Sequence, residues 1–196
     1  PRLELADLFK LYQGRLDSLS PAELKVVHAI INCRSAALGG HVLRCDGCGE
    51  GEVSYNSCRN RHCPKCQFMA RAKWVDARVG ELLPGVPYFH VVFTLPHELN
   101  PIILHNKRRL YTLLFKSSSD TVKQVGSQRL AGAQMGLTAV LHTWSQKLMD
   151  HPHIHMIVPG GGLSPDHTQW VPTPEKYLLP TKVLSAVYRG KFLEAL

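Results

Sequence analysis

The sequence of 196 residues lacks three features that would place it in familiar classes. It contains no apolar run of the roughly 18 residues that a transmembrane helix needs, so we expect no membrane partner. It has no cysteine before Cys33 or after Cys66, whereas a disulfide-stapled secreted domain spreads its cysteines more widely. It is also short of acidic residues, with 15 Asp and Glu against 23 Lys and Arg. The net charge of +8 favours a polyanionic partner, although charge alone points only weakly to nucleic acid.

Two breaks in pattern indicate how the sequence is organised. The first residue is not Met and the last residues, KFLEAL, read as the middle of a helix, so we expect a C-terminally truncated fragment of a longer protein. Pro84, Gly85 and Pro87 interrupt a helical pattern before a strand-like run begins. We therefore predict two modules, residues 1–84 and residues 85–196.

The cysteines form two pairs with the spacing of zinc knuckles. Cys45 and Cys48 are followed after 14 residues by Cys63 and Cys66, and each pair can place two thiolates on one tight turn. Glycines beside Cys48, and Pro64 inside the second pair, suit the backbone of such turns. We predict one structural zinc ion held by these four thiolates. The alternative is a buried or redox-active dithiol.

Two cysteines remain, and histidines lie near them in the sequence. Cys58 and His62 are four residues apart, which places two ligands on one face of a helix. A second zinc site built from Cys33, His41, Cys58 and His62 is therefore a further hypothesis. The alternative is that these are small buried thiols and surface histidines. Closed sites of this kind stabilise a small fold and rarely carry out chemistry.

A basic segment includes the second cysteine pair and continues beyond it. Between Cys58 and Arg78 only Asp76 opposes six cations, and Trp74 adds an aromatic surface. The functional interpretation is a face that contacts DNA phosphates, and the alternative is a solvated helix face. We favour DNA because the charge lies on a metal-ordered module. The six cations are Arg59, Arg61, Lys65, Arg71, Lys73 and Arg78.

Two histidines alternate with an apolar residue in a strand-like run. His153 and His155 flank Ile154, so both imidazoles point to one face of the strand, where they can hold one divalent ion. A neighbouring antiparallel strand would present Gln146 or His142 as a third ligand. The alternative is a pair of solvated or hydrogen-bonded histidines. The apolar strand and the glycine-rich turn that follows favour a metal site.

Four stretches of the sequence together resemble the two-tyrosine rolling-circle transposases of bacterial insertion sequences. These enzymes belong to the HUH nuclease class and carry an N-terminal zinc-binding domain. The resemblance extends over nearly the whole chain, and the cysteine run and the HPHIH run are its most specific parts. The four stretches are AALGGH at 36–41, NSCRNRHCPKCQ at 56–67, HVVFTLP at 90–96 and HPHIH at 151–155.

The resemblance implies a single-strand DNA nickase and strand transferase that carries out DNA transposition. In that family two histidines and a third polar ligand hold Mg²⁺ or Mn²⁺, and a tyrosine hydroxyl attacks to form a 5′-phosphotyrosine link. The motif places the histidines at His153 and His155. We expect Gln146 rather than His142 as the third ligand, because it lies nearer across a short turn. The zinc module and its basic flank would hold single-stranded transposon ends in the bacterial cytoplasm, at the nucleoid.

The tyrosines are where the sequence departs from the family pattern. The family has two catalytic tyrosines close together on one helix. Tyr177 and Tyr188 lie 11 residues apart, about 16 Å along a helix, which is too far to serve one metal ion. Tyr188 is a weak candidate nucleophile, and its alternative role is packing in an amphipathic helix. We expect the chain to bind DNA and metals without cleaving alone. The alternative function is a non-catalytic, zinc-dependent DNA-binding remnant of a transposase.

The fold class that we predict is α+β. The first module should be a helical zinc-knuckle module, followed by part of an HUH-nuclease antiparallel sheet with helices on one face and the two histidines on its central strand. Periodicity and turn residues predict the following elements. Helices are expected at 3–15, 20–31, 68–83, 100–129 and from 181, and strands at 41–44, 52–56, 88–95 (central), 137–146 and 153–158.

Overall fold

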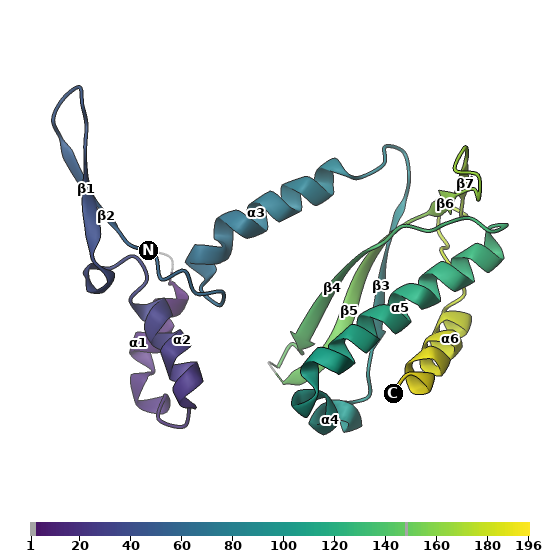
Figure 1. Ribbon diagram of the computed structural model, residues 1–196, viewed down its shortest axis with the longest axis horizontal. Coiled ribbons are helices and arrows are strands. Elements are labelled where there is room, and N and C mark those ends of the chain that lie inside the picture. The colour runs from purple at the N-terminus through teal and green to yellow at the C-terminus, as the bar shows by residue number, and fades with distance from the viewer. Residues whose placement is uncertain (1–2, 148) are drawn as a thin grey trace. The chain divides into compact units, whose positions relative to one another are not determined.

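The computed structural model describes residues 3–147 and 149–196, which form two compact units (Figure 1). The first unit ends at Leu82 and the second begins at Leu83. Each unit has its own buried core. Among the described residues, no helix is both long and apolar enough to cross a membrane.

The first unit combines three α-helices with one β-hairpin. Helix α2 begins with the capping box that its sequence predicts. The Ser20 hydroxyl accepts from the Glu23 backbone N–H, and the Glu23 carboxylate accepts from the Ser20 N–H at 2.8 Å. The elements are α1 (Leu5–Leu11), α2 (Pro21–Ile31), β1 (Gly40–Arg44), β2 (Gly51–Tyr55) and α3 (Pro64–Gly80), with 3-10 turns at Gln13–Arg15 and Ala36–Leu38.

The core of the first unit is very small. Its buried members are Ala6, Ile30, Cys33 and Cys63. Helix α3 has no buried residue, and every residue of β1 is exposed. A unit of this size that buries so little apolar surface needs a further source of stability, such as a metal ion. Two of the four core side chains are cysteines, which places the thiols where a larger domain would have aliphatic residues.

The second unit is built on a three-stranded antiparallel sheet. The strand order is β3–β5–β4, so the strand with His153 and His155 is central, as predicted. A second, two-stranded sheet of β6 and β7 follows. The elements are β3 (Tyr88–Thr94), a 3-10 turn at His97–Leu99, α4 (Asn100–His105), α5 (Lys107–Arg129), β4 (Thr138–Trp144), β5 (Asp150–Pro159), β6 (Gly161–Leu163), β7 (Trp170–Pro172) and α6 (Thr181–Glu194).

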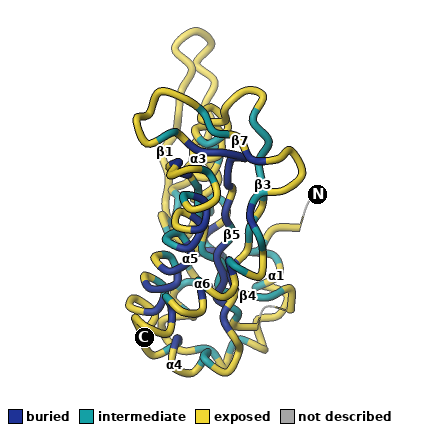
Figure 2. Tube along the Cα trace, turned by 90° about the vertical axis from the view of Figure 1, so that its right-hand side faces the viewer, coloured by how far each residue is buried: buried dark blue, intermediate teal, exposed yellow. Residues whose placement is uncertain are grey.

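Alternation along β5 separates two faces of the sheet. Ile154, Met156 and Val158 are fully buried in a core that α5 and α6 share. His153 and His155 project to the other face, because strand side chains alternate. Figure 2 shows β5 buried along much of its length. The helices of the second unit therefore cover one face of the sheet, and no described element of this unit covers the histidine face.

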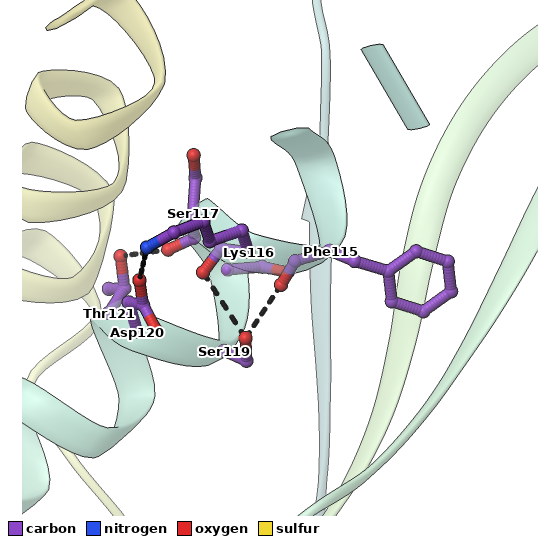
Figure 3. A network of polar contacts seen from close by, with 7 residues as sticks. Phe115, Lys116, Ser117, Ser119, Asp120 and Thr121 are labelled. Atoms are coloured by element: carbon purple, nitrogen blue, oxygen red, sulfur yellow. Dashed lines mark hydrogen bonds and ion pairs between the residues drawn. The ribbon is translucent and has the colours of Figure 1, made fainter. Parts of the chain in front are cut away.

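Helix α5 buries a polar stretch without losing hydrogen bonds. Ser117, Ser118 and Thr121 are buried, and the Thr121 hydroxyl donates to the Ser117 carbonyl at 2.6 Å (Figure 3). On the solvent side of the same turns, Lys116 pairs with Asp120 at 2.7 Å. The buried Ser118 and Thr121 hydroxyls thus find their acceptors within their own helix, which helps this helix to cover the sheet despite its polar sequence.

Two predictions for the strands need correction. The strand at 88–95 was expected to be central, but within the described residues β3 pairs only with β5 and lies at the edge. The strand expected to reach Gln146 ends at Trp144, and β5 begins at Asp150, earlier than expected. A short turn explains the second difference, because the Ser145 N–H already donates to the Met149 carbonyl at 2.9 Å.

Candidate metal centres

Four thiols of the first unit lie together in its core. The Sγ atoms of Cys33, Cys58, Cys63 and Cys66 are all within 4.8 Å of one another. Cys66 Sγ is 3.5 Å from both Cys33 Sγ and Cys58 Sγ. Tetrahedral zinc with Zn–S bonds of about 2.3 Å holds its sulfurs about 3.8 Å apart, so this set fits a zinc ion with little adjustment.

Local structure brings these thiols together. Cys33 follows helix α2, and Cys58 follows strand β2. Cys63 caps the N-terminus of α3, and Cys66 lies in its first turn. The positive end of the helix dipole favours thiolates at both of these positions.

Three of these thiols have shifted pKa values. Burial, followed by the neighbouring thiols, raises the pKa of Cys58 to about 12. Burial also raises the pKa of Cys33. At Cys66 burial acts in the same direction, but hydrogen bonds from the other three thiols outweigh it and lower the pKa to about 7. One thiolate is therefore favoured at the expense of the others, and a dication would allow all four to ionise.

The structure groups the cysteines differently from the sequence prediction. Cys45 and Cys48 lie in the turn between β1 and β2, are exposed, and do not meet Cys63 and Cys66. The physical reason is the length of the hairpin, because five residues per strand at about 3.3 Å each carry this turn about 16 Å from the hairpin base. Backbone N–H groups of Cys48 and Gly47 lower the pKa of Cys45 there.

The set predicted for a second zinc is also divided. Cys33 and Cys58 take the places in the main cluster that were assigned to Cys45 and Cys48. His41 lies exposed on β1, and His62 is exposed, with its Nε2 accepting from Arg61 Nε at 3.2 Å. Neither histidine joins a group of three or more ligands among the described residues.

The six basic residues divide into free and paired side chains. Lys65 forms an ion pair with Glu4, which raises the pKa of Lys65. Arg78 pairs with Glu81 and lies over the Trp74 ring, 5.6 Å from its centroid. The cations that remain exposed, with no acidic partner in the described chain, are Arg59, Arg61, Arg71 and Lys73.

A second group of potential metal ligands lies on the uncovered face of the sheet in the second unit. Ring nitrogens of His142, His153 and His155 are all within 4.8 Å of one another. His142 faces His153 across the β4–β5 ladder, and the His142 and His155 ring centroids are 4.3 Å apart. Nitrogen ligands at about 2.1 Å from one ion lie up to about 4.2 Å apart, so small side-chain shifts would complete a site.

Hydrogen bonds orient two of these rings. His153 Nδ1 lies 2.6 Å from the His151 carbonyl oxygen, to which it donates, leaving Nε2 free to bind a metal. His155 Nδ1 lies 2.7 Å from His90 Nε2, and the two ring planes are within 7° of each other with their centroids 4.9 Å apart. A metal on His155 Nε2 would require Nδ1 to donate to His90, which makes His90 a second-layer support that the sequence prediction missed.

Electrostatics at this group favours neutral imidazole. Burial lowers the pKa of His155, and charge on His142, His153 or His90 would lower it further. Neutral imidazole is the form that binds metal ions. The lowered pKa therefore favours the ligating form of His155, the ring that also contacts His90.

The residue that the structure brings beside His153 and His155 is His142. Gln146, the expected third ligand, is exposed in the turn after β4. The reason is register: β5 begins at Asp150, so His142 rather than Gln146 faces His153. The alternation of His142, Trp144 and Gln146 was visible in the sequence, but the register was not.

Neither tyrosine lies at the histidine group. Tyr188 is buried on α6, where its ring packs against Phe93 at 4.9 Å and its hydroxyl is 3.4 Å from the Thr94 carbonyl. Burial raises the pKa of Tyr188, which opposes its use as a nucleophile. Phe93 belongs to the helix-covered core, so Tyr188 is on the opposite face from the histidines. Tyr177 is exposed in the segment before α6.

Comparisons with known proteins point to one family. Residues 5–95 match a family model described as "Transposase zinc-binding domain", and residues 136–196 match one described as "Putative transposase". The chain is 49% identical to "Putative transposase y4qJ" of Sinorhizobium fredii, over 98% of this chain and 50% of that protein. It is 33% identical to the transposase for insertion sequence element IS801 of Pseudomonas savastanoi pv. phaseolicola, over 74% of this chain and 35% of that protein.

The chain thus spans about half or less of the length of these curated relatives. Two solved structures of the conjugative relaxase TrwC in complex with oriT DNA, one described as metal-bound and one as copper-bound, also match. They are 14% and 16% identical, with TM-scores of 0.42 and 0.44, over 54% of this chain and 41% of the relaxase chain. On the sequence matches, the chain belongs to the family of IS91-type transposases with a zinc-binding domain.

Proposed function

We propose that this chain forms the DNA-binding and metal-binding part of a rolling-circle transposase. The complete protein would nick and rejoin single-stranded DNA at the ends of a mobile element. The observation that carries this proposal is the convergence of His142, His153 and His155 on the uncovered face of the sheet. Family membership supports the same function.

The three imidazoles would hold one divalent cation, with Mn²⁺ and Mg²⁺ as candidates. Such an ion supplies polarisation of a phosphoryl oxygen and orients the phosphate for in-line attack. Mg²⁺ prefers oxygen ligands and keeps its waters, so a set of three nitrogens favours Mn²⁺. His90 and the His151 carbonyl would hold two of the rings in place, which preserves the site while DNA enters and leaves.

The histidine face also offers a surface for unpaired bases. Trp144 stacks on His142, with 4.9 Å between ring centroids and 14° between planes, and about half of its side chain is exposed. Val92 and Val140 are also exposed beside the rings. Aromatic and apolar side chains next to a metal site suit single-stranded DNA, whose bases are free to stack.

The first module, residues 1–84, would hold DNA by its phosphates. Arg71 and Lys73 project from α3 without acidic partners, and Arg59 and Arg61 lie beside the thiol cluster. Lys65 and Arg78 are already paired with carboxylates and should contribute less. A zinc ion on Cys33, Cys58, Cys63 and Cys66 would fix the N-terminus of α3 and so the position of these cations.

The attacking hydroxyl would come from outside this chain, since Tyr188 is buried on the far face of the sheet. In the second module, residues 85–196, we therefore propose a metal site without its nucleophile. The same observation favours one alternative, a non-catalytic zinc-dependent DNA-binding remnant of a transposase. The two functions differ in whether the histidine group binds a divalent ion.

Calorimetric titration of Mn²⁺ into the zinc-loaded chain tests the proposal. We expect one Mn²⁺ per chain, with affinity reduced more than about 100-fold in His142→Ala. Gln146→Ala, from the adjoining turn, is the matched control and should bind as the unchanged chain does. Labelled single-stranded DNA incubated with Mn²⁺ should bind without forming a covalent adduct on a denaturing gel.

Three results would change these conclusions. DNA binding without Mn²⁺ binding would support the remnant. If Gln146→Ala lost Mn²⁺ binding and His142→Ala did not, Gln146 would be supported as the third ligand, as the sequence predicts. A covalent adduct that disappears in Tyr188→Phe would show that this chain carries its own nucleophile.

A further inference from the structure

The hairpin of the first unit ends in two thiols that the main cluster does not use. Cys45 and Cys48 lie in the turn between β1 and β2, at the end of the hairpin far from α1 and α2 (Figure 1). The turn is closed by two backbone hydrogen bonds: the Cys45 N–H donates to the Glu50 carbonyl at 2.8 Å, and the Gly49 N–H donates to the Cys45 carbonyl at 2.9 Å. Gly49 has a φ of +76°, which favours glycine at this position. This ordered turn holds the two cysteines three residues apart, the spacing at which a tight turn supplies two thiolates to one metal ion.

These two thiols make half of a tetrahedral metal site. A closed zinc site needs four ligands, and a C-x-x-C turn supplies two of them. Within residues 3–147 and 149–196, no third Cys, His, Asp or Glu joins Cys45 and Cys48 in a ligand group. The histidine of the same hairpin, His41, pairs with Ser54 at the other end of the ladder. A closed site at this turn therefore needs two further ligands, which a second copy of the chain can supply.

The surface behind the turn suits a protein partner better than DNA. Val42 and Val53 face each other across the ladder and are 66% and 53% exposed. The charged groups there are one arginine, Arg44, and three carboxylates, in a chain whose net charge is +8. The exposed valines favour a protein contact, because a two-stranded hairpin gains stability when its apolar side chains are covered. The three carboxylates are Asp46, Glu50 and Glu52.

We propose that two copies of this chain meet at these turns and share one zinc ion, each contributing Cys45 and Cys48. A twofold axis through the ion converts two identical thiol pairs into the four ligands that a closed site requires. Each thiol passes its proton to the buffer as its zinc–sulfur bond forms, so no oxidant is involved. The symmetric contact would also cover Val42 and Val53 of both copies. This assembly is a property beyond the proposed transposition chemistry and does not depend on the histidine group.

Light scattering after gel filtration, combined with zinc analysis, tests the proposal on the full chain under reducing conditions. We expect a mass twice that of one chain and three zinc ions for every two chains, two in the separate thiol clusters and one shared. The double variant Cys45→Ser with Cys48→Ser should be a monomer with one zinc ion per chain. Its retained zinc shows that the core cluster and the fold are intact. Glu52→Gln, on the same hairpin outside the turn, should remain dimeric.

Cobalt substitution gives a second readout. Tetrathiolate cobalt has a charge-transfer absorption. Per chain, this absorption should be about 1.5 times as strong in the unchanged protein as in the double variant, because the unchanged dimer holds three such sites for every two chains. A monomer with one zinc ion per chain would overturn the proposal. A monomer with two zinc ions per chain would overturn it as well, because the turn would then find its ligands within its own chain. A dimer that persists in the double variant would show that other residues hold the copies together.

Discussion

The candidate metal ligands belong to the core in the first unit and lie outside the core in the second unit. In the first unit Cys33 and Cys63 are themselves half of a four-residue core. In the second unit sixteen buried residues form the core, and the three converging histidines lie outside it. We therefore expect the thiol cluster to stabilise the first unit and the histidine group to leave the stability of the second unit nearly unchanged. Metal removal should unfold the first unit and leave the second folded.

The largest expected effect is that of Cys63→Ser. This change removes a ligand that is also a buried core residue, and structural zinc contributes on the order of 10 kcal/mol to such folds. We expect loss of zinc and unfolding of the first unit, with the thermal transition of the second unit unchanged. Zinc analysis with calorimetric melting measures both. Cys45→Ser is the matched control for the melting of the first unit. Unchanged zinc content and melting in Cys63→Ser would contradict the assignment of the core cluster.

His90→Ala should produce a smaller effect in the second unit, without any loss of stability. Removing the ring that contacts His155 Nδ1 frees the orientation and tautomer of His155. Supporting residues of this kind change metal affinity by about 10–100-fold. We expect weaker Mn²⁺ binding by titration and an unchanged melting temperature. His97→Ala, an exposed histidine elsewhere in the unit, should change neither. A melting temperature that falls with affinity would mean that His90 supports the fold.

The two clusters should also respond differently to pH. The pKa of His155 is lowered from 6.5, so protons compete with Mn²⁺ at this ligand only below that pH. The pKa values of Cys33 and Cys58 are raised, so zinc must displace protons from these thiols throughout the neutral range. Apparent zinc affinity should rise with pH from about 7 upward, whereas Mn²⁺ affinity should stay level. Competition titrations with a chelator of known pH dependence check this. If the zinc and Mn²⁺ affinities changed with pH to the same extent, the expected difference between the two clusters would be wrong.

The smallest expected effects are those of single cations on DNA binding. Arg71→Ala should weaken binding to single-stranded DNA and lower the salt dependence by about the equivalent of one phosphate contact. Lys65→Ala should have less effect, because Lys65 is already paired with Glu4. Fluorescence anisotropy at several salt concentrations measures both slopes. Equal losses in the two variants would mean that DNA displaces Glu4 from Lys65.

Local patterns in the sequence predicted most of the elements, because their signals lie within a few residues. The capping box at Ser20 and the alternation around Ile154 are of this kind. Pairing between distant segments was not predictable in the same way. Cys33 and Cys58 join the main cluster only because the hairpin carries Cys45 and Cys48 away from it. His142 rather than Gln146 faces His153 because the turn lies at 145–149, earlier in the sequence than expected.

His90 illustrates a different limit of sequence reasoning. Its strand was predicted correctly, and its side chain alternates with Val91 on β3. Nothing local indicates that β3 pairs with β5 in the register that sets His90 within reach of His155. A residue whose role depends on two strands that are more than sixty positions apart becomes visible only in the folded chain.

The alternation of β5 ties the histidine group to the aliphatic core, with a consequence for insertions and deletions. Adding or removing one residue ahead of His153 within β5 would exchange the two faces, so that imidazoles entered the core and Ile154 met solvent. A register shift of β4 by two residues, through a change in the turn between β4 and β5, keeps the alternation of both strands and alters which β4 residue faces His153.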